Sequence, residues 1–183
     1  MPRTGVTEFN KEIIDSTSDL VCAYKQNLAF YEALGSDGLT ALEETVKYVP
    51  GNIPVIGDAK RGDVGHTARA YARALFEVLG FDAVTVNPYL GRDSIEPFVA
   101  YADRAVFILC RTSNPGAADL QDAACAVGQT NGSPQPLYQL VARKAREWNT
   151  RNNIGLVVGA TYPQELREIR QICTQMHLLI PGI

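Results

Sequence analysis

The sequence has 183 residues, of which 46% are hydrophobic and 20% are charged, a composition that favours one folded domain over residues 1–183. The net charge is only -3 and the 17 Lys and Arg residues are scattered, which argues against a nucleic acid or an anionic membrane as partner. No apolar run reaches the roughly 18 residues of a membrane span. A small molecule is therefore the expected partner.

The N-terminal stretch has no basic start followed by an apolar run, so we expect no secretory signal and predict a cytoplasmic location. The four cysteines are far apart in the sequence and form no CxxC pair, which argues against a zinc site or a redox pair. We expect them to be reduced thiols.

Apolar runs of strand length alternate with segments of helical periodicity, which predicts an α/β fold with a parallel sheet. Gly80 stands where a left-handed residue commonly ends a helix, and Pro163 stands where the first turn of a helix tolerates proline. In chain order, the expected elements are a helix at 7–16, a strand at 20–25, a helix at 38–48, a strand at 53–60, a helix at 67–79, a strand at 83–87, a helix at 93–102, a strand at 105–111, a helix at 137–149, a strand at 155–159, a helix at 163–173 and a strand at 178–181.

Residues 114–136 interrupt this alternation. The stretch is rich in Pro, Gly, Ala, Gln and Ser, and it is long for a connection between a strand and a helix. We therefore expect a functional loop or a lid there.

Polar residues gather where the expected strands end. In parallel barrels the active site is built from the loops at the carboxyl ends of the strands, so this placement favours a (β/α)8 barrel. A doubly wound sheet usually binds its ligand at one switch point with a Gly-rich turn, and no such turn is present. The residues concerned are Lys25, Asn27, Asp58, Lys60, Asn87, Arg111, Thr112, Ser113 and Thr161.

The segment IPVIGDAKRGDVGHTARAYA carries the strongest signal. Alternate residues of a strand face the same side, so Asp58 and Lys60 are expected to point into the barrel mouth, with Asp63 in the following loop and Lys25 nearby. Opposite charges about 4 Å apart interact by roughly 4 kcal/mol at an effective dielectric near 20. Such an array holds a lysine charged, so that it can donate a proton and stabilise a developing carbanion.

A structural interpretation of the same residues is also available. DxKxxD is a short pattern that chance often produces, and charges at a strand end usually form solvated ion pairs worth about 0–1 kcal/mol. The pattern gains weight only from the rest of the sequence.

Six segments of the sequence support a functional interpretation of the pattern: YKQNLAFYEALG, DAKRGDVGHTA, TVNPYLGRDSI, LCRTSNPGAADLQD, GLVVGATYPQEL and LLIPGI. In this order they resemble the strand ends of the orotidine 5'-phosphate decarboxylase family, from about residue 8 onwards. They are most similar to the bacterial branch that carries TSNPGA and VVGATYP. The resemblance implies removal of the carboxylate of orotidine 5'-phosphate to give uridine 5'-phosphate, without a metal or an organic cofactor.

The resemblance also implies roles for single residues. Lys60 is expected to protonate C6 of the pyrimidine, while Lys25, Asp58 and Asp63 complete the charge network. Members of the family are homodimers in which each subunit contributes residues to its partner's active site. The resemblance therefore implies that Asp63, Val64 and Thr67 act in the active site of the partner subunit. Ser113 is expected to contact the pyrimidine ring, and Pro181 to begin a loop that closes over base and phosphate.

Other residues are expected to be structural. His66 is expected to cap or pack beside the motif. Tyr71, Phe76 and Trp148 are expected in the core or an interface. Asn87 and Arg92 have no assigned role.

The resemblance is incomplete, because the sequence has no counterpart of the family's first strand or of its last strand with the phosphate-binding arginine. We therefore expect an incomplete barrel of about six βα units, an internal fragment of a longer protein. Two alternatives remain open. One is a magnesium-dependent sugar-phosphate decarboxylase or aldolase, which shares the scaffold and the DxKxxD motif. The other is a fragment that is catalytically incompetent and acts only as a phospho-ligand or dimerisation module.

Overall fold

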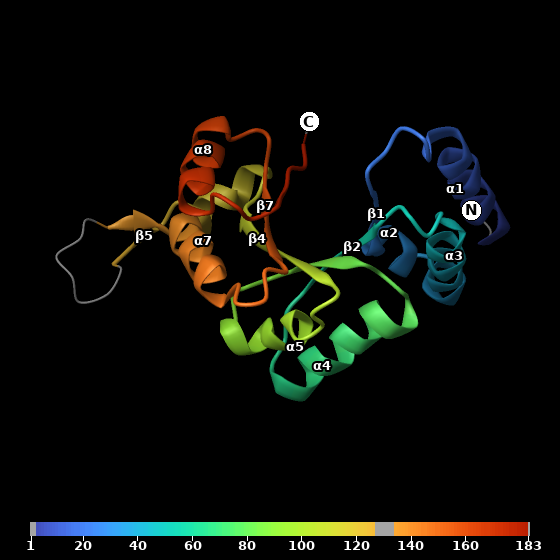
Figure 1. Cartoon of the computed structure of the whole chain (residues 1–183), viewed down its shortest axis with the longest axis horizontal. Coiled ribbons are helices and arrows are strands. Elements are labelled where there is room, and N and C mark those ends of the chain that lie inside the picture. The colour runs from blue at the N-terminus through green and yellow to red at the C-terminus, as the bar shows by residue number, and fades with distance from the viewer. Residues whose placement is uncertain (1–2, 127–133, 183) are drawn as a thin grey trace.

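A six-stranded parallel sheet forms the centre of the computed structural model, which describes residues 3–126 and 134–182 (Figure 1). Every hydrogen-bonded pair of neighbouring strands in this sheet is parallel, as the alternation of strands and helices predicts. In order across the sheet, the strands are β1 (Tyr24–Asn27), β2 (Val55–Arg61), β3 (Ala83–Val86), β4 (Ala105–Arg111), β7 (Ile154–Val158) and β8 (Leu178–Leu179).

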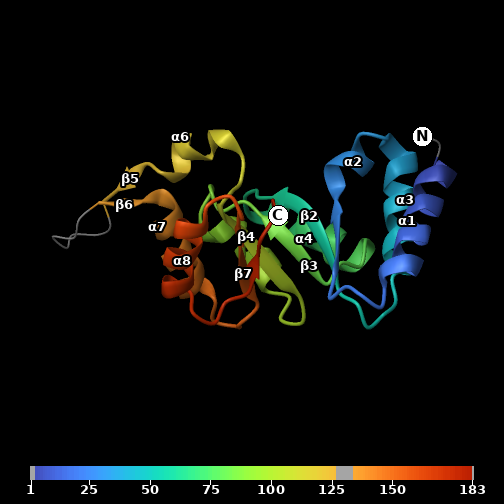
Figure 2. The ribbon, with the colours of Figure 1, turned by 90° about the horizontal axis from the view of Figure 1, so that it is seen from above.

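The helices follow one another in an arc around this sheet (Figures 1 and 2). Helices α1, α2 and α3 lie at the β1 end of the sheet, α4 and α5 lie below its middle in the view of Figure 1, and α7 and α8 lie beside β4 and β7. The order along the chain is α1 (Arg3–Thr17), α2 (Leu28–Glu32), α3 (Gly35–Tyr48), α4 (Gly65–Arg73), α5 (Glu96–Val99), α7 (Leu137–Trp148) and α8 (Pro163–Ile172). A strand followed by a helix that returns to the next parallel strand is the repeating unit of a barrel.

The N-terminal part of the sheet differs from the sequence prediction in two respects. The expected strand at 20–25 begins only at Tyr24, because the apolar stretch before it is partly in solvent and Leu20 is 77% exposed. Helix α2 was not expected, since five residues are too few to show a helical period. Its first turn is capped by the side chain of Asn27, which accepts a hydrogen bond from Ala29 N at 3.2 Å.

Three other expected elements are built differently. The helix expected at 67–79 begins at Gly65 and passes into a π-helical turn at Ala74–Val78, and Gly80 follows with φ +76°. The helix expected at 93–102 is a 3₁₀ turn at Arg92–Ser94 followed by the short α5. The stretch 114–136 holds a 3₁₀ turn (Pro115–Ala117), α6 (Ala118–Gln121) and an antiparallel pair, β5 (Ala124–Cys125) with β6 (Gln135–Pro136). Residues 127–133 of the loop or lid expected at 114–136 lie outside the described residues.

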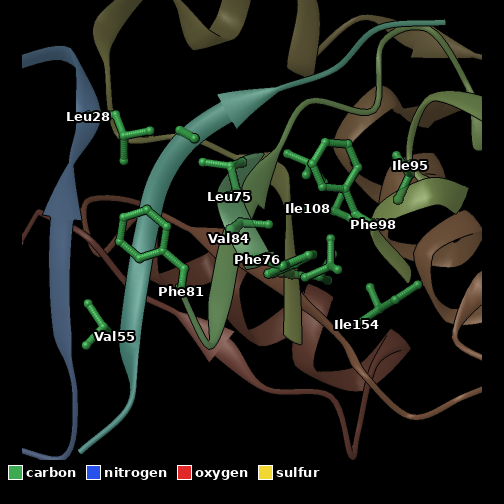
Figure 3. Close-up of a cluster of buried hydrophobic side chains, with 14 of the residues drawn as sticks. Leu28, Val55, Leu75, Phe76, Phe81, Val84, Ile95, Phe98, Ile108 and Ile154 are labelled. Carbon is green, nitrogen blue, oxygen red and sulfur yellow. The ribbon is translucent and has the colours of Figure 1, made fainter. Parts of the chain in front are cut away.

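The apolar core lies between the sheet and the helices, as Figure 3 shows for the side chains around β2, β3 and β4. Phe81 is fully buried and packs directly on Gly57, where a Cβ atom would lie 2.7 Å from the Phe81 ring. Burial of such a side chain stabilises the fold by about 1.5–3 kcal/mol. Gly57 is therefore the residue that lets β2 pass over Phe81 on its way to the polar strand end. Of the three aromatic residues expected in the core or an interface, Phe76 is buried, Trp148 is partly buried and Tyr71 is 36% exposed.

Candidate active site

Three charged side chains meet at the carboxyl ends of β1 and β2. Asp58 Oδ2 accepts a hydrogen bond from Lys25 Nζ at 3.0 Å, and Asp58 Oδ1 accepts one from Lys60 Nζ at 2.6 Å. The Asp58 side chain is only 11% exposed, whereas Lys25 and Lys60 are 34% and 48% exposed. One nearly buried carboxylate thus holds two ammonium groups that still face solvent.

A local distortion of β2 produces this arrangement. The register between β2 and β3 shifts between Gly57 and Arg61, which marks a bulge that contains Asp58 and Lys60. Lys60 has φ +49°, a left-handed conformation that costs a residue with a Cβ about 1–2 kcal/mol. Such outliers persist where the surrounding structure enforces them, and they cluster at functional sites.

The electrostatics of Asp58 follow from its neighbours. Burial on its own would raise the pKa of this carboxyl group, because desolvation disfavours the charged form. Hydrogen bonds from Lys60, Lys25 and Thr85 outweigh that effect and hold the pKa of Asp58 below its usual value. Asp58 is therefore an anion at neutral pH, fixed in place between its donors.

The Thr85 hydroxyl is part of this cluster, although the sequence did not single it out. Its Oγ1 donates to Asp58 Oδ1 at 2.9 Å and accepts from Lys60 N at 3.0 Å. The only available signal was one polar residue inside the apolar strand AVTV, which is weak evidence.

The cluster opens into a cavity of about 470 Å³. Ser113 and Pro181, the two residues expected to contact a ligand from the same chain, are among those that line it. Close packing brings their two segments together: a Cβ atom on Gly159 would lie 2.8 Å from Ser113 Cβ, and Ala160 N donates to Pro181 O at 2.9 Å. Apolar side chains, among them Leu109, Val157 and Leu179, line the cavity as well.

The other three expected site residues, Asp63, Val64 and Thr67, do not join the cluster within the described part of the chain. The Asp63 carboxylate accepts a hydrogen bond from Val64 N at 2.7 Å, and Val64 is 52% exposed. Thr67 donates its backbone N–H to Val64 O at the start of α4. Val64 is exposed, whereas Asp63 and Thr67 are partly buried.

Arg111 anchors the loop that carries Ser113. The sequence placed this arginine among the polar strand-end residues, but it is 1% exposed. Its guanidinium lies 3.8 Å from the centroid of the Tyr162 ring and 3.3 Å from Asp122 Oδ2. Gln121 receives a further hydrogen bond from Arg111 at 3.4 Å and also accepts from Thr112 N at 2.8 Å. Arg111 therefore ties the stretch after β4 to the end of β7.

Residues without an assigned role lie elsewhere. Asn87 lines a larger, mainly apolar hollow of about 530 Å³ together with Tyr89 and Trp148. Arg92 lines a smaller one of about 180 Å³. His66 is exposed in the first turn of α4, so it does not pack in the core. The charged cluster, and not the larger apolar hollow, has the groups that acid–base chemistry requires.

The described residues contain neither a candidate metal site nor a helix that could span a membrane. Within residues 3–126 and 134–182, no three or more His, Cys, Asp or Glu side chains are grouped so that they could bind a metal ion. In the same ranges, no helix has the length and apolar character needed to span a membrane.

The fold and the strand-end site define a barrel of the (β/α)8 class that is incomplete in this chain. Two solved structures from Leishmania donovani, an OMP decarboxylase and a UMP synthase, each superpose with a TM-score of 0.93 and 44% identity. Both alignments cover 100% of this chain, but only 71% and 40% of those two chains.

The model of the Orotidine 5'-phosphate decarboxylase / HUMPS family matches residues 6–183, and the chain belongs to this family. Curated relatives named orotidine 5'-phosphate decarboxylase include proteins of Roseiflexus castenholzii, 57% identical over 98% of this chain, and Herpetosiphon aurantiacus, 52% identical over 100%. The chain spans about two thirds of these relatives, 64% and 67% of their lengths. The expected family and the expected incomplete barrel are both confirmed.

Proposed function

We propose that this chain decarboxylates orotidine 5'-phosphate to uridine 5'-phosphate, a step of pyrimidine biosynthesis, with Lys60 as the proton donor. The observation that carries the proposal is the position of Lys60 Nζ, 2.6 Å from Asp58 Oδ1, at the wall of a cavity large enough for a ligand. The names of the relatives support the same reaction.

The chemistry follows from the charges. Loss of carbon dioxide breaks the bond between C6 and the carboxylate and leaves its electron pair on C6. The two ammonium groups of Lys25 and Lys60 stabilise that developing negative charge, because their positions are fixed by Asp58 before the reaction begins. Lys60 then gives a proton to C6, and the neutral amine takes a proton from solvent before the next turnover.

The remaining site residues have proposed roles that complete the pocket. Ser113 contacts the pyrimidine, and the segment that begins at Pro181 closes over base and phosphate. Asp63, Val64 and Thr67 enter the active site of a partner subunit in a homodimer. Two observations support this arrangement: Val64 is 52% exposed, and the Asp63 carboxylate accepts its hydrogen bond from Val64 N and not from a lysine of the cluster.

We further propose a cytoplasmic location. All four cysteines are free thiols, which fits a reducing compartment.

The direct test is loss of the ultraviolet absorption of orotidine 5'-phosphate. We expect Lys60→Ala to lower the rate by at least about 10²–10³-fold, the range seen when one preorganised hydrogen-bond donor is removed from an active site. Lys47→Ala is the matched control, because Lys47 is a 70% exposed lysine on α3 that pairs with Glu43. Full activity of Lys60→Ala would remove the proposed proton donor.

A chelator separates this proposal from the magnesium-dependent alternative. Both carboxylate oxygens of Asp58 already accept hydrogen bonds from ammonium groups, which leaves this residue poorly placed as a magnesium ligand. We therefore expect the rate to be unchanged by EDTA. Calorimetry with uridine 5'-phosphate addresses the second alternative: binding without turnover would identify a ligand-binding module.

A further inference from the structure

The bulge in β2 leaves one backbone donor without a partner in the sheet. On β2, Gly57 pairs with Val84 of β3, and Arg61 pairs with Val86. The three β2 residues from Asp58 to Lys60 therefore lie opposite a single β3 residue, Thr85. The ladder therefore has no regular backbone acceptor for the N–H of Lys60. A backbone donor without a partner is costly where water cannot reach it, and the hydrogen bond of Lys60 N is partly buried.

The Thr85 side chain takes the place of that missing acceptor. Its hydroxyl oxygen accepts from Lys60 N at 3.0 Å, and its single proton goes to Asp58 Oδ1 at 2.9 Å. The side chain has no freedom to choose other partners, since Thr85 is only 1% exposed. One hydroxyl thus connects the backbone of the strained residue to the carboxylate that orients its side chain.

We infer that Thr85 is a positioning residue for the charged cluster: its hydroxyl holds Lys60 in the left-handed conformation and fixes the Asp58 carboxylate that aligns Lys25 and Lys60. Thr85 acts through these residues and does not itself exchange protons with a substrate. The two hydrogen bonds of Thr85 are present in the chain without a ligand. Only the effect of Thr85 on catalysis rests on the proposed function.

Two substitutions separate the hydroxyl from the volume of the side chain. Thr85→Val keeps the branched shape and removes the hydroxyl, whereas Thr85→Ser keeps the hydroxyl and leaves a methyl-sized gap. If Thr85 positions the cluster, Thr85→Val is the damaging change and Thr85→Ser is mild. If Thr85 only fills space in the core, the order of the two effects is reversed.

The first measurement needs no substrate. Carbon-detected NMR titration of the Asp58 carboxyl group should give a higher pKa in Thr85→Val than in the wild type, because a hydrogen bond to the charged form is lost. Deuterium exchange of the Lys60 amide should become faster by about tenfold in the same variant, since the loss of one hydrogen bond to a charged or strained group has roughly this effect. Thr85→Ser should match the wild type in both measurements.

The second measurement concerns turnover. We expect Thr85→Val to lower kcat by about tenfold with little change in KM, because a shifted proton donor affects the reacting state more than binding. Thr85→Ser should restore kcat. If the wild type does not decarboxylate orotidine 5'-phosphate, the proposed function fails, and the NMR data alone then decide the role of Thr85.

A measurement on the wild type covers the case in which Thr85→Val does not fold. The hydroxyl proton of Thr85 should exchange slowly enough to be observed by NMR, with a cross-relaxation signal to the Lys60 amide. A rapidly exchanging hydroxyl proton would overturn the inference, as would an unchanged Asp58 pKa in a folded Thr85→Val protein.

Discussion

The carboxylate of Asp58 has three donors, and its charge contributes to stability as well as to the proposed chemistry. We expect Asp58→Asn to lower the free energy of unfolding by about 1–2 kcal/mol at pH 7, less than for a fully buried pair because both lysines are partly in solvent. The folded pKa of Asp58 lies below its unfolded value, so this contribution is present above the unfolded pKa and is lost as pH falls through the folded pKa.

Urea unfolding of both proteins between pH 7 and about pH 3 measures this effect, because other groups titrate in both proteins and cancel in the difference. The difference in stability should stay constant down to about pH 5 and then shrink toward pH 3. A difference that grows on acidification would contradict the assigned interactions.

At Lys60, the backbone conformation can be tested apart from the charge. Both Lys60→Gly and Lys60→Ala remove the ammonium group, but only glycine adopts φ +49° without strain. We expect the glycine variant to be the more stable by about 1 kcal/mol, the opposite of the usual preference for alanine. Chemical denaturation of the two variants checks this, and a more stable alanine variant would mean that the strain at Lys60 is absent.

Among the structural elements, the link between β4 and the end of β7 depends on Arg111. A lysine cannot reproduce the planar stack on Tyr162, so Arg111→Lys should cost about 2 kcal/mol. A double-mutant cycle with Tyr162→Leu should give a coupling of about 1–2 kcal/mol. The matched control is Arg167→Lys on the exposed side of α8, expected within about 0.5 kcal/mol of the wild type. Additive effects of Arg111→Lys and Tyr162→Leu would show that the stack contributes nothing.

The elements that the sequence predicted best have a clear apolar pattern. Strand β7 (Ile154–Val158) is a short apolar run that is buried at every residue, and the helix at Leu137–Trp148 buries Tyr138, Ala142 and Ala145 at helical spacing. The short α2 and the π-helical turn at Ala74–Val78 have no such period. Their form depends on tertiary packing, which a single sequence does not reveal.

The site was predictable in part for a related reason. Lys25, Asp58 and Lys60 end parallel strands, and parallel strands bring such residues to one edge. The bulge at Lys60 and the hydrogen bonds of Thr85 depend on the register between two strands, which the sequence pattern does not encode. The burial of Arg111 depends on a ring from a distant segment, Tyr162.

At the scale of the whole molecule, the proposed homodimer predicts that two inactive variants restore activity when they form mixed dimers. Lys60→Ala and Asp63→Ala should each be inactive alone, because each damages every active site. When the two variants are mixed and allowed to exchange subunits, the mixed dimers have one intact site, and about a quarter of the wild-type activity should return. No recovery despite proven subunit exchange would place Asp63 and Lys60 in the same site of one chain, or Asp63 outside the site.

A crystal structure of the chain with uridine 5'-phosphate tests the central claim most directly, namely that the cluster of Lys25, Asp58 and Lys60 is the floor of the nucleotide site. The account predicts the pyrimidine in the 470 Å³ cavity, with C6 facing Lys60 Nζ and Ser113 beside the ring. A nucleotide bound instead in the apolar hollow near Tyr89 and Trp148, away from the charged cluster, would contradict it.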